Sequence, residues 1–148
     1  MLCYGLAGAQ CLDSSRIDPY YACFDGFNPV CGCDGMTYRS ACAAEHRGGV
    51  INYISGVCDN FFIDFVPNPV VNYPGEFSAY LKYPGTLVLQ IYDSFARIKF
   101  SKTYYTSSPE QKIGPDNINF SGFENGIFFV VATVGGESKS VSVLHVIE

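Results

Sequence analysis

Charge is scarce in this 148-residue chain, which has 9 Lys and Arg against 14 Asp and Glu and a formal net charge of -5. Tryptophan is absent, and no cluster of Lys and Arg is present. Nucleic acid and anionic membrane surfaces attract such clusters, so neither is expected as the main partner. The longest apolar run, Ile127 to Val134, is far shorter than the roughly 20 residues that a membrane-spanning helix needs.

The sequence also lacks the residue sets of common catalytic and cofactor sites. Its two histidines, His46 and His145, lie in regions of different composition. No Gly-rich phosphate loop joins a strand pattern to a helix pattern, and no carboxylates have the spacing of a calcium loop. We therefore expect no enzyme activity, no metal and no small-molecule cofactor. A fragment of a secreted hydrolase, with an acid pair of unfamiliar spacing, remains a third hypothesis beside the two developed below.

Cysteine is missing after Cys58, and all seven cysteines lie between Cys3 and that residue. Such crowding indicates either a disulfide framework or a metal site. The residues available to a zinc ion are Cys23, Cys31, Cys33, Cys42 and His46. The C-x-C spacing fits zinc poorly, so disulfides are favoured. Because disulfides persist in oxidising compartments, they imply export.

The first residues resemble the end of a leader sequence. Ala7-Gly8-Ala9 matches the A-x-A pattern of a signal-peptide cleavage site. We expect residues 1–9 to be a signal-peptide remnant, whose removal takes away Cys3 and leaves six cysteines. The alternative is a flexible N-terminus with a spare thiol.

The chain after Cys58 is rich in β-prone runs that are separated by turn residues such as Asn125-Gly126. The predicted strands are Phe61–Val66, Phe77–Tyr83, Thr86–Tyr92, Arg97–Thr103, Ile113–Phe120, Gly126–Val134 and Lys139–Ile147. Leu87, Leu89 and Ile91 alternate with other residues, as in a strand with one buried face. The pattern predicts an all-β sandwich. The only helix expected in the chain runs from Ser40 to Arg47, with Ser40 as its cap and Gly48-Gly49 as its end.

The segment from Cys11 to Cys58 carries an ordered series of short motifs, and seven residues separate Cys23 from Cys31. The further motifs are Pro29-Val30-Cys31-Gly32, Asp34-Gly35, Thr37-Tyr38, Cys42 near the start of the expected helix, and Gly56-Val57-Cys58. On these residues the segment resembles a Kazal-type serine protease inhibitor domain over its whole length. The resemblance implies a small, disulfide-rich α+β module over residues 10–58.

The cysteine pattern departs from the usual family at one place. Glu45 stands where a cysteine is usual, and Cys33 is an extra cysteine, as in a bacterial C-x-C variant of the family. The resemblance implies the bridges Cys23–Cys42 and Cys31–Cys58, and Cys11–Cys33 then takes the two cysteines that remain. Six cysteines allow fifteen connectivities, so the residues alone do not choose among them.

The resemblance also implies an inhibitory loop made of Phe24, Asp25, Gly26 and Phe27. In the family such a loop is presented to a serine protease as a substrate mimic, here with Asp25 in the specificity pocket and Asp25–Gly26 as the scissile bond. The family braces this loop with a Thr and an Asn, where this chain has Phe24 and Ser40. Two alternatives follow: Asp25-Gly26 is an ordinary turn, and the module is a non-inhibitory surface binding or adhesion domain.

The second part of the chain carries the motifs Val66-Pro67-Asn68-Pro69-Val70, Leu89–Ile98, Phe123–Val130 and a basic-apolar tail from Lys139. In this order they resemble the type A sorting domain of the bacterial type IX secretion system, which usually has Gly where Ala96 stands. The resemblance implies a linker over 59–66 and an immunoglobulin-like sandwich over 67–148. It also implies recognition by the secretion machinery, and a location outside a didermic bacterium or on its surface, reached through the periplasm.

The residues that would carry the sorting signal are Pro67, Asn68, Pro69, Tyr92, Asp93, Gly126 and Lys139. The alternative is a generic β-sandwich in which these are ordinary turn and surface residues.

Overall fold

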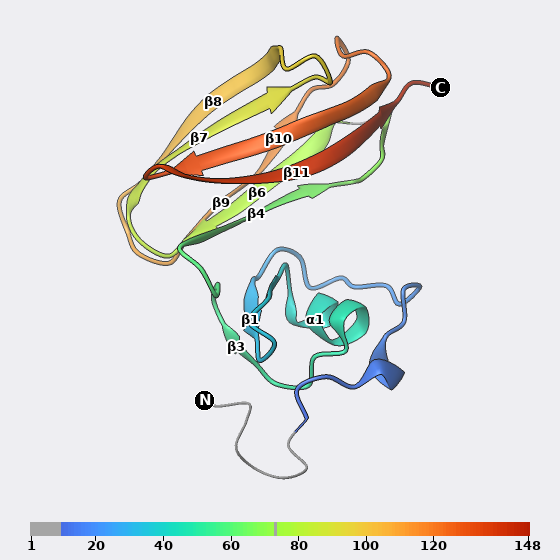
Figure 1. Ribbon diagram of the computed structural model, residues 1–148, viewed down its shortest axis with the longest axis vertical. Coiled ribbons are helices and arrows are strands. Elements are labelled where there is room, and N and C mark those ends of the chain that lie inside the picture. The colour runs from blue at the N-terminus through green and yellow to red at the C-terminus, as the bar shows by residue number, and fades with distance from the viewer. Residues whose placement is uncertain (1–9, 73) are drawn as a thin grey trace. The chain divides into compact units, whose positions relative to one another are not determined.

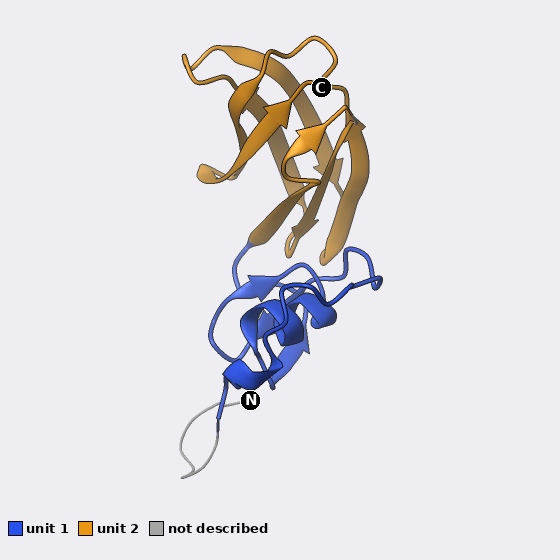
Figure 2. Ribbon diagram, turned by 90° about the vertical axis from the view of Figure 1, so that its right-hand side faces the viewer, with its two compact units in different colours: residues 1–60 blue, residues 61–148 orange. Residues whose placement is uncertain are grey.

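The structure is a computed structural model that describes residues 10–72 and 74–148. The expected signal-peptide remnant 1–9, with Cys3, lies outside the described residues. The chain divides into two compact units, Met1–Asn60 and Phe61–Glu148 (Figure 2). Within the described ranges, no helix has the length and apolar character needed to cross a membrane.

The first unit is a small disulfide-rich domain with a three-stranded antiparallel sheet and one short α-helix (Figure 1). The sheet has the order β2-β1-β3. The elements are a 3-10 turn (Ser14–Arg16), β1 (Val30–Gly32), β2 (Thr37–Tyr38), α1 (Ala41–Gly48) and β3 (Tyr53–Ser55). The helix lies where the sequence predicts it.

The local signals at the two ends of α1 act as expected. The buried Ser40 hydroxyl accepts a hydrogen bond from the N–H of Ala43 at 3.1 Å, which satisfies one of the unpaired donors of the first turn. Gly49 has φ of 65° and so lies in the left-handed region, which favours glycine at a helix end. A Cβ atom at Gly49 would come within 2.6 Å of the Asp13 carbonyl oxygen, so no other residue fits.

The core of the first unit is small. Val30, Ala44 and Val50 form it, and Tyr38 packs against it. Three disulfides join Cys11 to Cys33, Cys23 to Cys42, and Cys31 to Cys58. The last two are the pairs that the family resemblance implies, and the first joins the two cysteines that remain. A core of this size needs such cross-links to fold securely. The bridges also indicate an oxidising, extracellular-type environment.

The second unit contains two sheets that share one core (Figure 1). One has five strands in the order β5-β11-β10-β7-β8, and the other has three in the order β4-β6-β9. The strands are β4 (Phe61–Val66), β5 (Val70–Val71), β6 (Gly75–Leu81), β7 (Gly85–Tyr92), β8 (Ile98–Thr106), β9 (Gln111–Ile118), β10 (Gly126–Val134) and β11 (Glu137–Val146). Paired strands are antiparallel, except that β5 runs parallel to β11.

The predicted alternation in β7 is confirmed, because Leu87, Leu89 and Ile91 are fully buried in the common core. The other predicted strands are present with ends displaced by a few residues, and the short β5 was not predicted.

The linker expected over residues 59–66 needs a correction. Residues 61–66 form β4, which pairs along its length with β6. Phe61, Ile63 and Phe65 face the core, so the alternation that predicted a strand here decides the boundary. The second unit therefore begins at Phe61 and not at Pro67.

Candidate functional site: the exposed loop of the cysteine-rich unit

The loop between Cys23 and Cys31 is fixed at both ends. At its start, Cys23 is bridged to Cys42 in α1. Towards its end, the N–H of Asn28 donates to the carbonyl oxygen of Arg39 at 2.8 Å, and the next residue, Pro29, is buried. Residues 24–27, the predicted inhibitory loop, lie between these two attachments.

The four loop residues differ in what they present to solvent. Phe24 is 92% exposed, although an aromatic side chain gains from burial. Phe27 is half-buried. Gly26 has φ of 68°, in the left-handed region that favours glycine. The chain thus bends at Asp25 and takes a left-handed conformation at Gly26.

The side chain of Asp25 is hydrogen-bonded to the backbone of the first unit. Its Oδ2 atom accepts a hydrogen bond from the backbone N–H of Cys42 at 3.1 Å. Cys42 is the second residue of α1, and a carboxylate is favoured there because the first turn of a helix carries unpaired N–H groups and a partial positive charge. Asp25 thus adds a second cap to the helix that Ser40 begins.

Asp25 also belongs to the one group of possible metal ligands found among the described residues. Its carboxylate lies within 4.8 Å of the sulfur atoms of Cys23 and Cys42. Both sulfurs are in the same disulfide, so neither is the thiolate that zinc binds. Because Cys31 and Cys33 are bridged as well, the zinc alternative raised by the sequence is wrong for this structure.

Glu45, which stands where the family that this segment resembles has a cysteine, contributes a different cross-link. It accepts a hydrogen bond from the Tyr53 hydroxyl at 2.9 Å and so joins α1 to β3. This hydrogen bond, together with burial and the negative charges of Glu45 and Asp25, raises the pKa of Tyr53. The two elements are thus held together without a disulfide at this place.

The motif that follows the loop holds the frame of the unit. Tyr38 donates its hydroxyl to Asp34 at 2.7 Å. Burial is the main cause that raises the pKa of Tyr38 to about 12, and this hydrogen bond is the second cause. Thr37 accepts a hydrogen bond from the N–H of Cys58 at 2.9 Å, which ties β2 to the end of the unit. These motif residues therefore support the loop and lie outside it.

The segment before the loop is held against α1. Arg47 donates from Nη1 to the carbonyl oxygen of Asp18 and from Nη2 to that of Tyr21, both at 2.8 Å. The ring of His46 stacks on Tyr21 with 3.6 Å between centroids. His46 thus packs the segment before the loop against α1.

In the second unit, the side chain of Asn68 in the predicted sorting motif makes two hydrogen bonds to the backbone of β11. Its side-chain amide donates to the carbonyl oxygen of Ser142 at 3.0 Å, and its side-chain oxygen accepts from the N–H of Leu144 at 3.1 Å. Pro67 and Pro69 flank it. The side chain therefore fastens the segment before β5 to β11.

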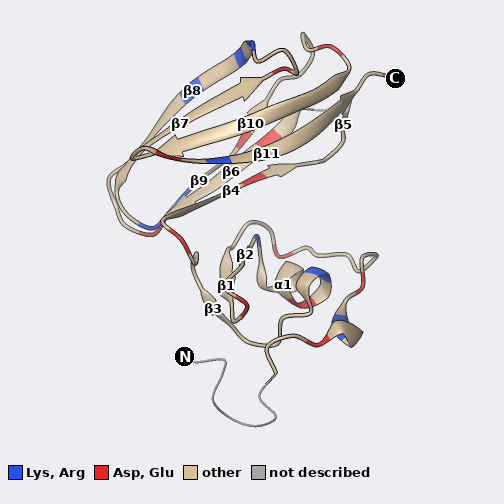
Figure 3. Cartoon of the chain, in the orientation of Figure 1, with Lys and Arg blue, Asp and Glu red and all other residues tan. Residues whose placement is uncertain are grey.

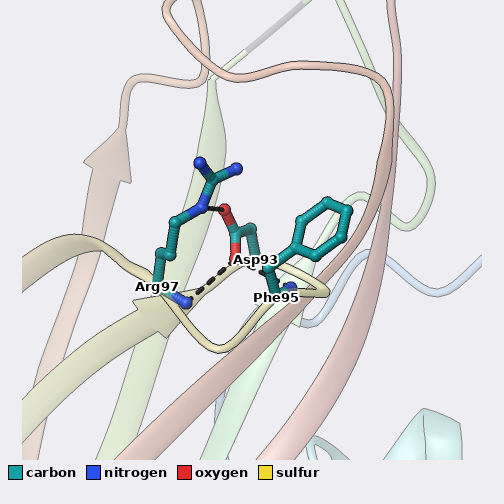
Figure 4. A network of polar contacts seen from close by, with 3 residues as sticks. All are labelled: Asp93, Phe95 and Arg97. Carbon is teal, nitrogen blue, oxygen red and sulfur yellow. Dashed lines mark hydrogen bonds and ion pairs between the residues drawn. The ribbon is translucent and has the colours of Figure 1, made fainter.

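Asp93 builds the turn between β7 and β8 (Figure 4). It is largely buried, and it accepts hydrogen bonds from the N–H of Phe95 and from the N–H and Nε of Arg97 at 2.7–2.9 Å. Burial raises the pKa of Asp93, but the hydrogen bonds from Arg97 and Phe95 outweigh it and leave the pKa below its usual value. Ala96 stands where the sorting-domain family that this unit resembles has Gly, and it has φ of 63°.

The other predicted sorting residues are spread over several strands. Tyr92 ends β7 and bonds Gln90 at 2.8 Å, and Gly126 begins β10 with φ of 141°. Lys139 of β11 lies over the ring of Phe61 at 5.2 Å, which is a cation–π contact between the two sheets.

His145 also has a structural environment. It is buried, its Nδ1 lies 2.9 Å from the carbonyl oxygen of Glu124, and its ring meets that of Phe120 edge-on.

Figure 3 shows the Lys and Arg residues distributed over separate elements of each unit.

Two contacts that organise these sites were not predicted from the sequence. The bond from Asp25 to Cys42 spans 17 residues, and the bond from Asn68 to Leu144 spans 76. Neither has a signal in local spacing, since each depends on elements that meet only in the fold.

No protein-family model matches the chain, and no curated protein or solved structure matches it either.

Proposed function

We propose that this chain is an exported serine protease inhibitor. Its first unit is a Kazal-like domain that offers loop residues 24–27 as a substrate mimic. Its second unit is an immunoglobulin-like sorting domain that the type IX secretion machinery recognises. The proposal joins the motif series of each unit to the disulfides and the two-sheet core.

One observation carries the inhibitor proposal. The loop is bracketed by the bridges Cys23–Cys42 and Cys31–Cys58, and it displays Phe24 almost fully to solvent. A loop already restrained near its bound shape loses less conformational freedom on binding. A short segment can then bind a protease tightly and resist release.

Titration of active serine proteases with the oxidised full chain tests this function. We expect stoichiometric loss of activity for at least one enzyme. The matched control is the same protein after reduction and alkylation, which breaks the disulfides on both sides of the loop. This form should act only as an ordinary substrate. Cleavage of the oxidised protein without inhibition of any protease would contradict the proposal.

A second candidate function is protein binding without inhibition. It is favoured by Ser40, which takes the place of the Asn that braces the loop in the related family. Ser40 is fully buried, and its hydroxyl caps α1 through Ala43. If the titration shows no inhibition, the same loop becomes the candidate surface for a partner protein.

The sorting proposal is supported by the order of motifs in the second unit and by the compactness of that unit. A reporter fused ahead of residues 61–148, expressed in a bacterium with type IX secretion, should reach the medium or the cell surface. The matched control begins at residue 67 and lacks β4, which removes the strand that pairs with β6. Retention of the longer fusion in the periplasm would contradict the sorting proposal.

A further inference from the structure

The geometry points to Phe24, and not Asp25, as the residue that enters the specificity pocket of the target protease. The scissile bond is then Phe24–Asp25, and the partner is a serine protease with an apolar pocket that accommodates an aromatic ring. This inference rests on the proposed function of the same loop as an inhibitor, and it names the class of enzyme that the loop fits.

Phe24 has the properties that a pocket-filling residue needs. Its side chain is 92% exposed, so its apolar surface is free to be buried by a partner. It follows Cys23 directly, and the bridge to Cys42 restrains the backbone on that side. An aromatic ring enters an apolar pocket without the cost of removing water from a charge.

Asp25 has the opposite properties. Its carboxylate accepts the N–H of Cys42 at 3.1 Å and lies within 4.8 Å of both sulfurs of the neighbouring bridge. Entry into a pocket would break this hydrogen bond and remove a negative charge from the first turn of α1. It would also bury a carboxylate, which is costly unless the pocket supplies a positive partner.

The remaining loop residues do not compete with Phe24. Gly26 has no side chain, and Phe27 is already half-buried against its own unit. The backbone of Asn28 is anchored to Arg39. Among residues 24–28, Phe24 alone offers a large apolar side chain that is almost fully exposed.

Cys42 holds both sides of the Phe24–Asp25 bond. Its sulfur is bonded to Cys23, next to Phe24, and its N–H binds the carboxylate of Asp25. Hydrolysis adds one water across the peptide bond and leaves a carboxylate on Phe24 and an amine on Asp25. The Phe24 side stays joined to Cys42 through the disulfide of Cys23, and the Asp25 side keeps its hydrogen bond to the Cys42 N–H. The new amine is therefore held near the new carboxylate, which favours re-formation of the bond over release.

The test compares three enzymes on the oxidised full chain: chymotrypsin, which cleaves after aromatic residues, trypsin, and a serine protease that cleaves after Asp and Glu. We expect the tightest inhibition with chymotrypsin. Phe24→Ala should weaken it at least about 30-fold, the loss typical of a binding hot spot. Asp25→Asn keeps an acceptor for the Cys42 N–H, so chymotrypsin should remain inhibited.

Phe95→Ala is the matched control, since Phe95 is also a strongly exposed phenylalanine but lies in the second unit. It should leave inhibition unchanged. Mass spectrometry of the slowly cleaved complex should find a new amino terminus at Asp25. A new terminus at Gly26, or inhibition that is lost in Asp25→Asn and kept in Phe24→Ala, would overturn the assignment to Phe24. If the wild-type protein inhibits none of the three enzymes, the inhibitor function fails and this inference fails with it.

Discussion

Tyr104 of β8 donates its hydroxyl hydrogen to Asp116 of β9 at 2.5 Å, and these strands belong to different sheets. Lys102, also in β8, donates to the same carboxylate oxygen at 2.8 Å. β8 is an edge strand of the five-stranded sheet and β9 is an edge strand of the three-stranded sheet. Asp116 therefore links the two sheets along one side of their common core. Hydrogen bonds from Lys102 and Tyr104 lower the pKa of Asp116 although burial opposes them.

The second unit should therefore lose stability in acid through Asp116. In the unfolded chain the pKa of an Asp carboxyl group is near 4. A carboxyl group whose pKa is lower in the folded state stabilises the fold at pH values above the unfolded-state pKa. This contribution is lost as the pH falls through the lower folded value. Asp116→Asn should reduce the free energy of unfolding by about 1 kcal/mol at neutral pH. It should also weaken the pH dependence of unfolding below about pH 4.

Urea unfolding followed between pH 2.5 and 7 measures this effect. Glu76→Gln, which changes an exposed carboxylate in β6, is the control and should leave the urea midpoint at neutral pH nearly unchanged. An Asp116→Asn protein with the same acid dependence as the wild type would contradict the role of Asp116.

Replacement of Ala96 should stabilise the turn between β7 and β8. Ala96 has φ of 63°, a left-handed conformation that costs an L-residue roughly 1–2 kcal/mol. Ala96→Gly removes this cost but gives the unfolded chain more freedom. We expect a net gain of about 0.5–1 kcal/mol in urea unfolding. Gly135→Ala makes the reverse change at φ of 55° with open space around the new methyl group, and it should destabilise the same unit.

Asn68→Ala should destabilise the second unit by about 1–3 kcal/mol, since it removes two hydrogen bonds to β11 that typically contribute 0.5–1.5 kcal/mol each. Asn68→Asp keeps the acceptor for Leu144 and loses the donor to Ser142, so its effect should be smaller. Thermal unfolding of the full chain measures both. Equal stability of the wild type and Asn68→Ala would show that these contacts contribute nothing.

Export of the same variants separates structure from sorting. If Asn68 serves only the fold, export of each variant should follow its stability. Loss of export in a variant that remains stable would assign Asn68 to the sorting signal as well.

Reduction should unfold the first unit and leave the second unit intact. A disulfide typically contributes 2–4 kcal/mol, whereas the first unit has only a small apolar core. The second unit contains no cysteine. Limited proteolysis with and without reductant should therefore release a resistant fragment that begins near residue 61. A first unit that stays resistant after complete reduction would contradict this expectation.

Much of the fold was predictable because its signals are local. Ser40 and Gly49 mark the two ends of α1, and the alternation in β7 marks its buried face. The motif at Pro67 does not mark the boundary, because the alternation of Phe61, Ile63 and Phe65 forms a strand of the second unit before it. In the candidate site, the loop at residues 24–27 was indicated by the resemblance of the motif series to a known family.

The orientation of Asp25 was not predictable. It depends on where the first turn of α1 lies relative to a loop that is 17 residues earlier in the chain. The same limit applies to Asp116, because no sequence pattern places β8 and β9 at matching edges of two sheets. The family resemblance therefore indicated which residues form the loop, and the fold shows that Phe24 is the one whose side chain is almost fully exposed.

The parallel pairing of β5 with β11 has a mechanical consequence. The chain enters the second unit at β4, passes to β5 and leaves the unit after β11. When its two ends are pulled apart, β4 can peel from β6, but β5 must slide along β11. Pulling parallel strands from opposite ends loads their hydrogen bonds, and those of Asn68, together and not one after another. Under such a load, these contacts should therefore give way together.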